Sequence, residues 1–138
     1  MPEAKLSVDL FGLTTVSNND LGIGQIIENA FNYFDYVCPM VYPSHYADGF
    51  LGYASPASYP YQIITYSMEH ALMKLDAFKK KTGKTNVYLR PWLQDFNLKG
   101  VDYNAGTLKL EMQAVTDSLP GGNYTGFMIW NPENIYHL

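Results

Sequence analysis

Strand-like and helix-like segments alternate strictly along this chain, which limits the folds that it can adopt. Alternating apolar and polar positions predict four strands, at Leu6–Phe11, Tyr36–Tyr42, Asn86–Trp92 and Tyr124–Trp130. Each pair of consecutive strands is separated by a segment with helical spacing. The order β-α-β-α-β-α-β predicts a parallel sheet whose crossover connections are right-handed.

The three helices differ in how clearly the sequence marks their ends. The first is expected to begin after Asn19 or Asp20 and to carry Ile23 to Phe34 as its apolar stripe. The second is bounded by Pro60 and Gly83, which are typical first-turn and C-terminal residues. The third runs from Leu108 to Leu119 and stops at Pro120.

Two stretches depart from regular periodicity. The segment Pro43–Tyr61 is rich in Gly, Ser, Tyr and Pro, so we expect a long ordered loop, and loops of this length are usually functional. Pro39 interrupts the second strand and removes one ladder donor, which favours an edge strand or a bulge there.

The two faces of each predicted strand differ in kind. One face is aliphatic, whereas the other carries larger or polar groups such as Asp9, Tyr42, Arg90 and Trp130. A doubly wound sheet is apolar on both faces, but a (β/α)₈ barrel packs helices outside and places its active site at the inner ends of its strands. A complete barrel takes about 250 residues. Residues 1–138 are therefore predicted to form one partial α/β domain, half of a TIM-type barrel.

Composition excludes several classes of function. With 47% hydrophobic and 16% charged residues the chain is not disordered, and a net charge of -4 argues against nucleic acid as a partner. No apolar run reaches the roughly 18 residues that a membrane span needs. The single cysteine and the spacing of the histidines predict neither a metal site nor a cofactor.

Five strings in the sequence together resemble a bacterial family of predicted glycoside hydrolases. They are Ser7–Thr15, Leu21–Gln25, Cys38–Tyr46, Arg90–Phe96 and Met128–Asn131. The family is a (β/α)₈ barrel distantly similar to α-amylase-like and α-galactosidase-like enzymes. The resemblance implies that the four strands here are the fifth to eighth of that barrel, and that its N-terminal half supplies a further catalytic carboxylate on the fourth strand.

Glycoside hydrolysis uses two carboxyl groups that flank the scissile bond. Asp9 and Asp95 are the candidates in this chain, at the ends of the first and third predicted strands. The amylase-like pattern implies that Asp9 is the general acid, in place of a glutamate. It also implies that Asp95 orients the substrate and stabilises the transition state. Each could instead be structural, Asp9 as a carboxylate held by Arg90 and Asp95 as a loop cap.

Other side chains at the same strand ends could bind a sugar. Four aromatic residues could stack on its C–H face, and four polar residues could hydrogen-bond its hydroxyls. The aromatic candidates are Tyr42, Tyr46, Trp92 and Trp130, and the polar candidates are His45, Arg90, Gln94 and Asn131. His70 and His137 look like ordinary surface residues.

Three functional interpretations remain open at this stage. The first is the C-terminal half of a glycoside hydrolase that acts on a carbohydrate when joined to its N-terminal half. The second is a barrel that binds carbohydrate without hydrolysing it. In the third, two copies of the chain pair through the open edges of their first and last strands.

Overall fold

The computed structural model describes residues 3–138, whose strands form one parallel sheet. The strands are β1 (Ser7–Phe11), β2 (Tyr36–Met40), β3 (Tyr88–Leu89), β4 (Trp92–Gln94) and β5 (Met128–Trp130). Their order in the sheet is β1-β2-β4-β5, and β3 also pairs with β2. Every one of these pairings is parallel, which confirms the predicted parallel α/β architecture.

The third predicted strand is divided into β3 and β4 at the level where Pro39 of β2 lies. Residues 36 and 37 of β2 pair with residues 88 and 89, and Met40 pairs with Trp92. Continuing this register places Pro39 opposite Pro91. Pro39 has no backbone N–H to donate, so the ladder between β2 and this neighbour lacks a bond at that level. The carbonyl of Pro91 points the other way, toward β5, where it accepts from the Met128 N–H. The expectation of an edge strand at Pro39 is wrong, because β2 lies between β1 and β4.

The two long helices lie where their terminal residues predict. Helix α2 (Pro60–Thr82) ends at Gly83, which adopts the left-handed conformation with φ of 73°. Helix α3 (Ala105–Ser118) is capped by Asn104, whose side-chain oxygen accepts hydrogen bonds from the backbone N–H groups of Gly106 and Thr107.

Helix α1 (Ile27–Phe31) is much shorter than the sequence suggests. The backbone is left-handed at Leu21, Gly22 and Gly24, so these residues form turns instead of a first helical turn. The side chains of Asn19 and Asp20 stabilise those turns by accepting backbone hydrogen bonds from Leu21 and Gly22. Local turn chemistry therefore overrides the helical spacing of Ile23.

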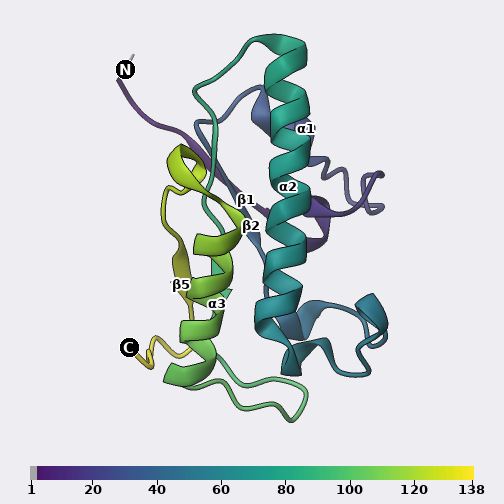
Figure 1. Ribbon diagram of the computed structural model, residues 1–138, viewed down its shortest axis with the longest axis vertical. Helices are drawn as coiled ribbons and strands as arrows, with labels where there is room; N and C mark the ends of the chain where they lie inside the picture. Colours follow the sequence, from purple (N-terminus) through teal and green to yellow (C-terminus); the bar gives the residue numbers. More distant parts are fainter. Residues whose placement is uncertain (1–2) are drawn as a thin grey trace.

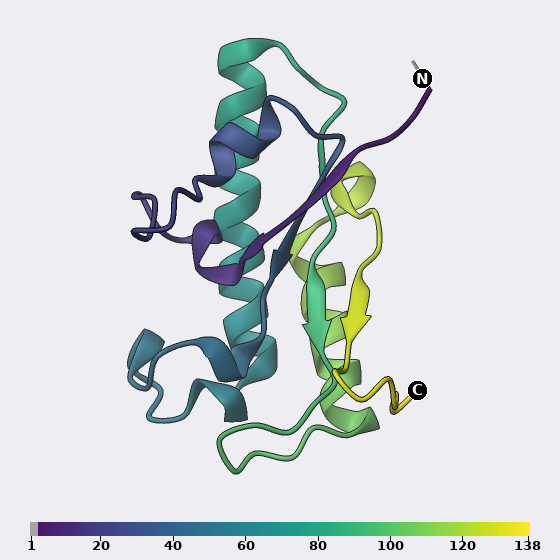
Figure 2. The same cartoon turned by 180° about the vertical axis from the view of Figure 1, so that it is seen from behind.

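The helices cover only one face of the sheet. Helices α2 and α3 pack side by side across it, with α1 beside α2 (Figure 1). The core between these layers includes Leu10, Val37, Leu89 and Leu93 from the sheet and its flanks. Seen from behind, the strands have no helix in front of them (Figure 2). The described residues thus leave the other sheet face, which carries the half-exposed Phe11 and Trp130, without a helical layer.

The long loop predicted after β2 is present. It contains three 3₁₀ turns, at Pro43–His45, Phe50–Gly52 and Pro56–Ser58. Tyr46 anchors it, because its ring is buried and its hydroxyl lies 2.7 Å from the Ser67 hydroxyl of α2. Across residues 3–138, no helix combines the length and the apolar character that a membrane crossing requires.

Candidate functional site

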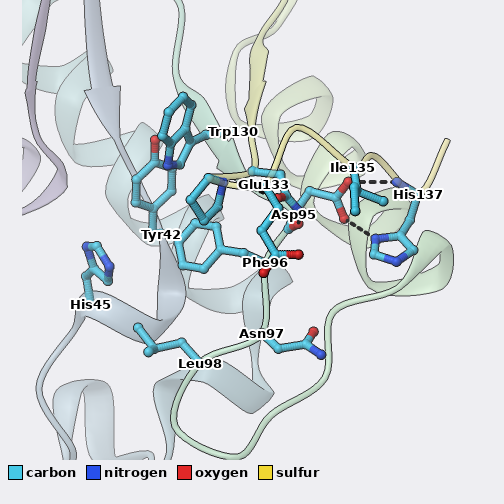
Figure 3. A pocket seen from close by; sticks show the side chains of 12 residues that line it. Tyr42, His45, Asp95, Phe96, Asn97, Leu98, Trp130, Glu133, Ile135 and His137 are labelled. Carbon is cyan, nitrogen blue, oxygen red and sulfur yellow. Dashed lines mark hydrogen bonds and ion pairs between the residues drawn. The ribbon is translucent and has the colours of Figure 1, made fainter.

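A cleft of about 650 Å³ opens at the carboxyl ends of β4 and β5. One wall comes from the loop after β2, with Tyr42 and His45. Another comes from residues 95–98 after β4, and the third from residues 130–137 at the end of β5 (Figure 3). In parallel sheets this edge is where ligands bind, so the cleft is the first candidate for a functional site.

Three rings form an aromatic wall in this cleft. Tyr42 meets both His45 and Phe96 edge to face, with ring centroids 5.3 and 5.4 Å away. Burial and the nearby Lys99 lower the pKa of His45, so its imidazole is neutral near pH 7. The wall therefore combines apolar ring surface with a neutral imidazole that can hydrogen-bond to a ligand.

The uncovered sheet face presents a carboxylate beside two tryptophans. Trp92 Nε1–H donates a 2.8 Å hydrogen bond to Asp9 Oδ1, linking β4 to β1 across β2. The Trp130 ring meets Trp92 edge to face at 6.4 Å and keeps 42% of its surface exposed. Asp9 is itself exposed. These residues bring an accessible acid group and an accessible aromatic face onto the same side of the sheet.

Asp95 lies in the cleft wall, but its carboxylate is fully buried. Oδ2 accepts a 2.8 Å hydrogen bond from the His137 backbone N–H, and Oδ1 lies 2.8 Å from the His137 ring nitrogen Nδ1 (Figure 3). The side chain of Asn131 donates to the Asp95 carbonyl. No local pattern pairs Asp95 with His137, because the two residues are 42 positions apart.

Gln94 takes part in a buried polar network and is not accessible to a ligand. Its side-chain amide accepts from Ser44 N–H at 3.1 Å and donates to the Ser44 hydroxyl at 2.7 Å. Its backbone N–H donates to Glu111 Oε1 on α3 at 3.0 Å. Tyr46 is also buried, so Gln94 and Tyr46 shape the loop after β2 without facing the cleft.

Glu111 is a buried acid that no sequence pattern singles out. Burial, with a smaller contribution from Asp95, raises the pKa of Glu111 well above its usual range, although the hydrogen bond from Gln94 opposes this. Its Oε2 atom has no hydrogen-bond partner among the described residues. A protonated Glu111 is consistent with this environment.

The raised pKa of Glu111 predicts a loss of stability with increasing pH. The folded state holds the proton more tightly than the unfolded state. Its advantage is therefore complete below the ordinary glutamate pKa of 4.5 and is lost as pH rises through the folded-state pKa. Glu111→Gln keeps an acceptor for the Gln94 N–H and removes the titration. We expect this variant to be more stable than the wild type at about pH 8 and to show a flatter pH dependence.

Urea unfolding at about pH 5 and about pH 8 measures this difference. The matched control is Glu69→Gln, which changes an exposed glutamate on α2. If the stabilities of Glu111→Gln and the wild type fall in parallel between the two pH values, Glu111 is not the group responsible.

Arg90, which the sequence places among the candidates for binding sugar hydroxyls, is not among the residues that line the cleft. Its guanidinium stacks 4.2 Å above the ring of Tyr36, the first residue of β2, and its Nε–H donates to the Thr125 carbonyl. Within residues 3–138, no three His, Cys, Asp or Glu side chains come together as a group able to hold a metal ion. The accessible polar and aromatic groups of this region thus include Asp9, His45, Glu133, His137 and the aromatic rings.

A comparison with family models gives one result that covers almost the whole chain. Residues 2–136 match the family described as "putative glycosyl hydrolase domain". Comparisons with curated proteins and with solved structures gave no match. Because the match spans far more than half of its length, this chain belongs to that family of glycosyl hydrolase domains.

Proposed function

We propose that this chain is the C-terminal half of a (β/α)₈ glycoside hydrolase and that Asp9 is its general acid. The observation that carries the proposal is the shared position of Asp9, Trp92 and Trp130 on the uncovered sheet face. Asp9 donates a proton to the glycosidic oxygen as the bond from the anomeric carbon to that oxygen breaks. Water then supplies the hydroxyl of the new reducing end.

Carbohydrate is the substrate class that best fits the side chains of this region. Sugar rings have apolar C–H faces, which stack on aromatic rings, and hydroxyls, which need polar partners. Trp130 offers an exposed ring, while His45 and Asn131 lie in the adjoining cleft. The net charge of -4 disfavours polyanionic substrates, and neutral sugars carry no such penalty.

The half-barrel arrangement is supported by the exposed edges and face of the sheet. Strand β1 pairs only with β2 and β5 only with β4 among the described strands, so each leaves one edge unpaired. A closed barrel removes such edges and covers the inner face. In this proposal the partner is the N-terminal half of the barrel, which supplies the second catalytic carboxylate. A second copy of the chain is the alternative partner.

A carbohydrate-binding domain without hydrolytic activity is the second candidate. The observation that favours it is the complete burial of the Asp95 carboxylate, both of whose oxygens are occupied by His137. Asp95 then cannot contact a substrate directly. In this version the aromatic and polar residues still bind a sugar, but no bond is broken.

The binding step common to both candidates is tested by substituting Trp130. Trp130→Ala removes the exposed ring, and we expect it to weaken the binding of an oligosaccharide by about fivefold, since an aromatic contact contributes about 1 kcal/mol. Calorimetric titration of the intact protein with maltotetraose and with raffinose measures this change.

The matched control for Trp130→Ala is Tyr33→Ala, because Tyr33 is a highly exposed aromatic outside the cleft. Tyr33→Ala should bind both sugars as the wild type does. Equal affinities of Trp130→Ala and the wild type would show that the sugar binds elsewhere.

A further inference from the structure

We infer that His137 is the residue through which Asp95 acts: Asp95 positions the imidazole, and His137 Nε2 accepts a hydrogen bond from a sugar hydroxyl in the cleft. This inference rests on the proposed function, because it names a ligand-contacting residue of the same site. The sequence predicts Asp95 as the residue that contacts the ligand and His137 as an ordinary surface residue. The inference assigns the ligand contact to His137 instead.

Accessibility is the first argument. The Asp95 side chain is 0% exposed, whereas the His137 side chain is 46% exposed and lines the cleft. A carboxylate without accessible surface cannot touch a ligand, but a half-exposed imidazole can. The pair thus combines a buried anchor with an accessible polar group.

Hydrogen-bond geometry is the second argument. Asp95 holds His137 at two points, through the backbone N–H and through the ring nitrogen Nδ1, both at 2.8 Å. A carboxylate only accepts hydrogen bonds, so Nδ1 must carry the proton. In the neutral ring Nε2 is then an acceptor with a fixed orientation. Within residues 3–138 no side chain or backbone group bonds to Nε2, which leaves it available to a ligand.

The support of Asp95 itself is the third argument. Its backbone N–H donates to the Trp130 carbonyl at 2.9 Å, and its own carbonyl accepts from the Asn131 side chain. Two hydrogen bonds to the end of β5 therefore hold Asp95 in place, and Asp95 in turn fixes the position of the His137 ring. Rigid support of a polar group that faces a cleft is typical of ligand-binding sites.

Three other titratable side chains line the same cleft, and they are Tyr42, His45 and Glu133. Tyr42 and His45 belong to the opposite wall, and Glu133 to the same segment as His137. Burial, with contributions from Asp9 and Glu111, raises the pKa of Tyr42, so its hydroxyl stays neutral. Two carboxylates therefore line the cleft, the buried Asp95 and the exposed Glu133, and of these a sugar hydroxyl can contact Glu133.

The direct test is nitrogen NMR of the imidazole in the intact ¹⁵N-labelled protein, with and without maltotetraose and raffinose. We expect the neutral His137 ring to carry its proton on Nδ1, and sugar to shift the Nε2 resonance. In Asp95→Asn the amide donates to the ring instead, so the proton moves to Nε2. A proton on Nε2 in the wild type would overturn the inference without any reference to sugar.

The second test uses variants of His137. Asparagine at this position can still donate to Asp95 in place of Nδ1 but has no atom at Nε2. We expect His137→Asn to unfold like the wild type and to bind the better of the two sugars about three- to tenfold more weakly, the effect of one hydrogen bond. The control is His70→Asn, which alters a histidine of α2 bonded to the Tyr66 carbonyl and should bind normally.

The outcomes separate the two proposals. The role of His137 is overturned if His137→Asn binds sugar as tightly as the wild type and if sugar does not shift the Nε2 resonance of the wild type. The proposed carbohydrate function stands in that case. Failure of the wild type to bind either sugar overturns both. Weakened binding in His137→Asn with an Nδ1-protonated wild-type ring supports the inference.

Discussion

Replacing Asp9 with asparagine is expected to lower the kcat for glycoside hydrolysis by about 10² to 10⁴, the usual contribution of a general acid. Asparagine is nearly isosteric, and its side-chain oxygen can still accept the hydrogen bond from Trp92 Nε1–H. The position of the Trp92 ring should therefore be preserved. The variant removes the transferable proton while leaving sugar binding close to that of the wild type.

The measurement is steady-state hydrolysis of 4-nitrophenyl α-glucoside and α-galactoside by the complete barrel, with binding of the same sugars followed by calorimetry. Asp76→Asn, which changes an exposed carboxylate on α2, is the matched control and should leave kcat unchanged. Lost turnover with retained binding supports an enzyme. Binding by a wild type that never releases nitrophenol would instead support the non-catalytic carbohydrate-binding domain.

Replacing Gly12 with alanine is expected to destabilise the fold by about 3 kcal/mol, at the upper end of the usual cost of overpacking. Gly12 is buried directly after β1. An added Cβ would lie 2.4 Å from the Met40 carbonyl oxygen and 3.0 Å from the Tyr46 hydroxyl. The first contact is with backbone, so the ends of β1 and β2 must separate to relieve it.

Urea denaturation measures this effect, and Gly122→Ala provides the matched control. Nothing lies within 4 Å of a Cβ at Gly122, and its φ is not in the left-handed range. That variant should be neutral or slightly stabilising. Equal stabilities of Gly12→Ala and Gly122→Ala would mean that the strand ends adapt without cost.

Much of the fold follows from local sequence. Period-two and helical spacing suffice to predict the parallel α/β architecture, and the terminal signals of Pro60, Gly83 and Pro120 fall at or next to the observed helix ends. These features are local, because each depends on the backbone preferences of a few neighbouring residues. The family assignment is likewise in agreement with the resemblance carried by the five strings.

Where local patterns compete, the sequence is a poorer guide. The stripe that includes Ile23 and Ile26 predicts a long first helix, but the left-handed turns at residues 21–24 replace its first half. Pro39 suggests an edge strand or a bulge, yet β2 lies between β1 and β4, and the sheet accommodates the missing Pro39 donor at the break between β3 and β4. The first outcome reflects competition between two local signals, and the second depends on the neighbouring strands of the sheet, which local spacing does not contain.

The candidate site shows the same division between local and tertiary information. The sequence by itself predicted that Asp9, Trp92 and Trp130 belong to one face of the sheet. In each strand the aliphatic positions mark the side that packs on the helices, and alternation places these three residues on the opposite side. Only the tertiary structure decided which polar groups are accessible. It buried Gln94 and Asp95, moved Arg90 onto Tyr36 and brought His137 to Asp95. Accessibility depends on contacts between residues far apart in the chain, and no local pattern encodes them.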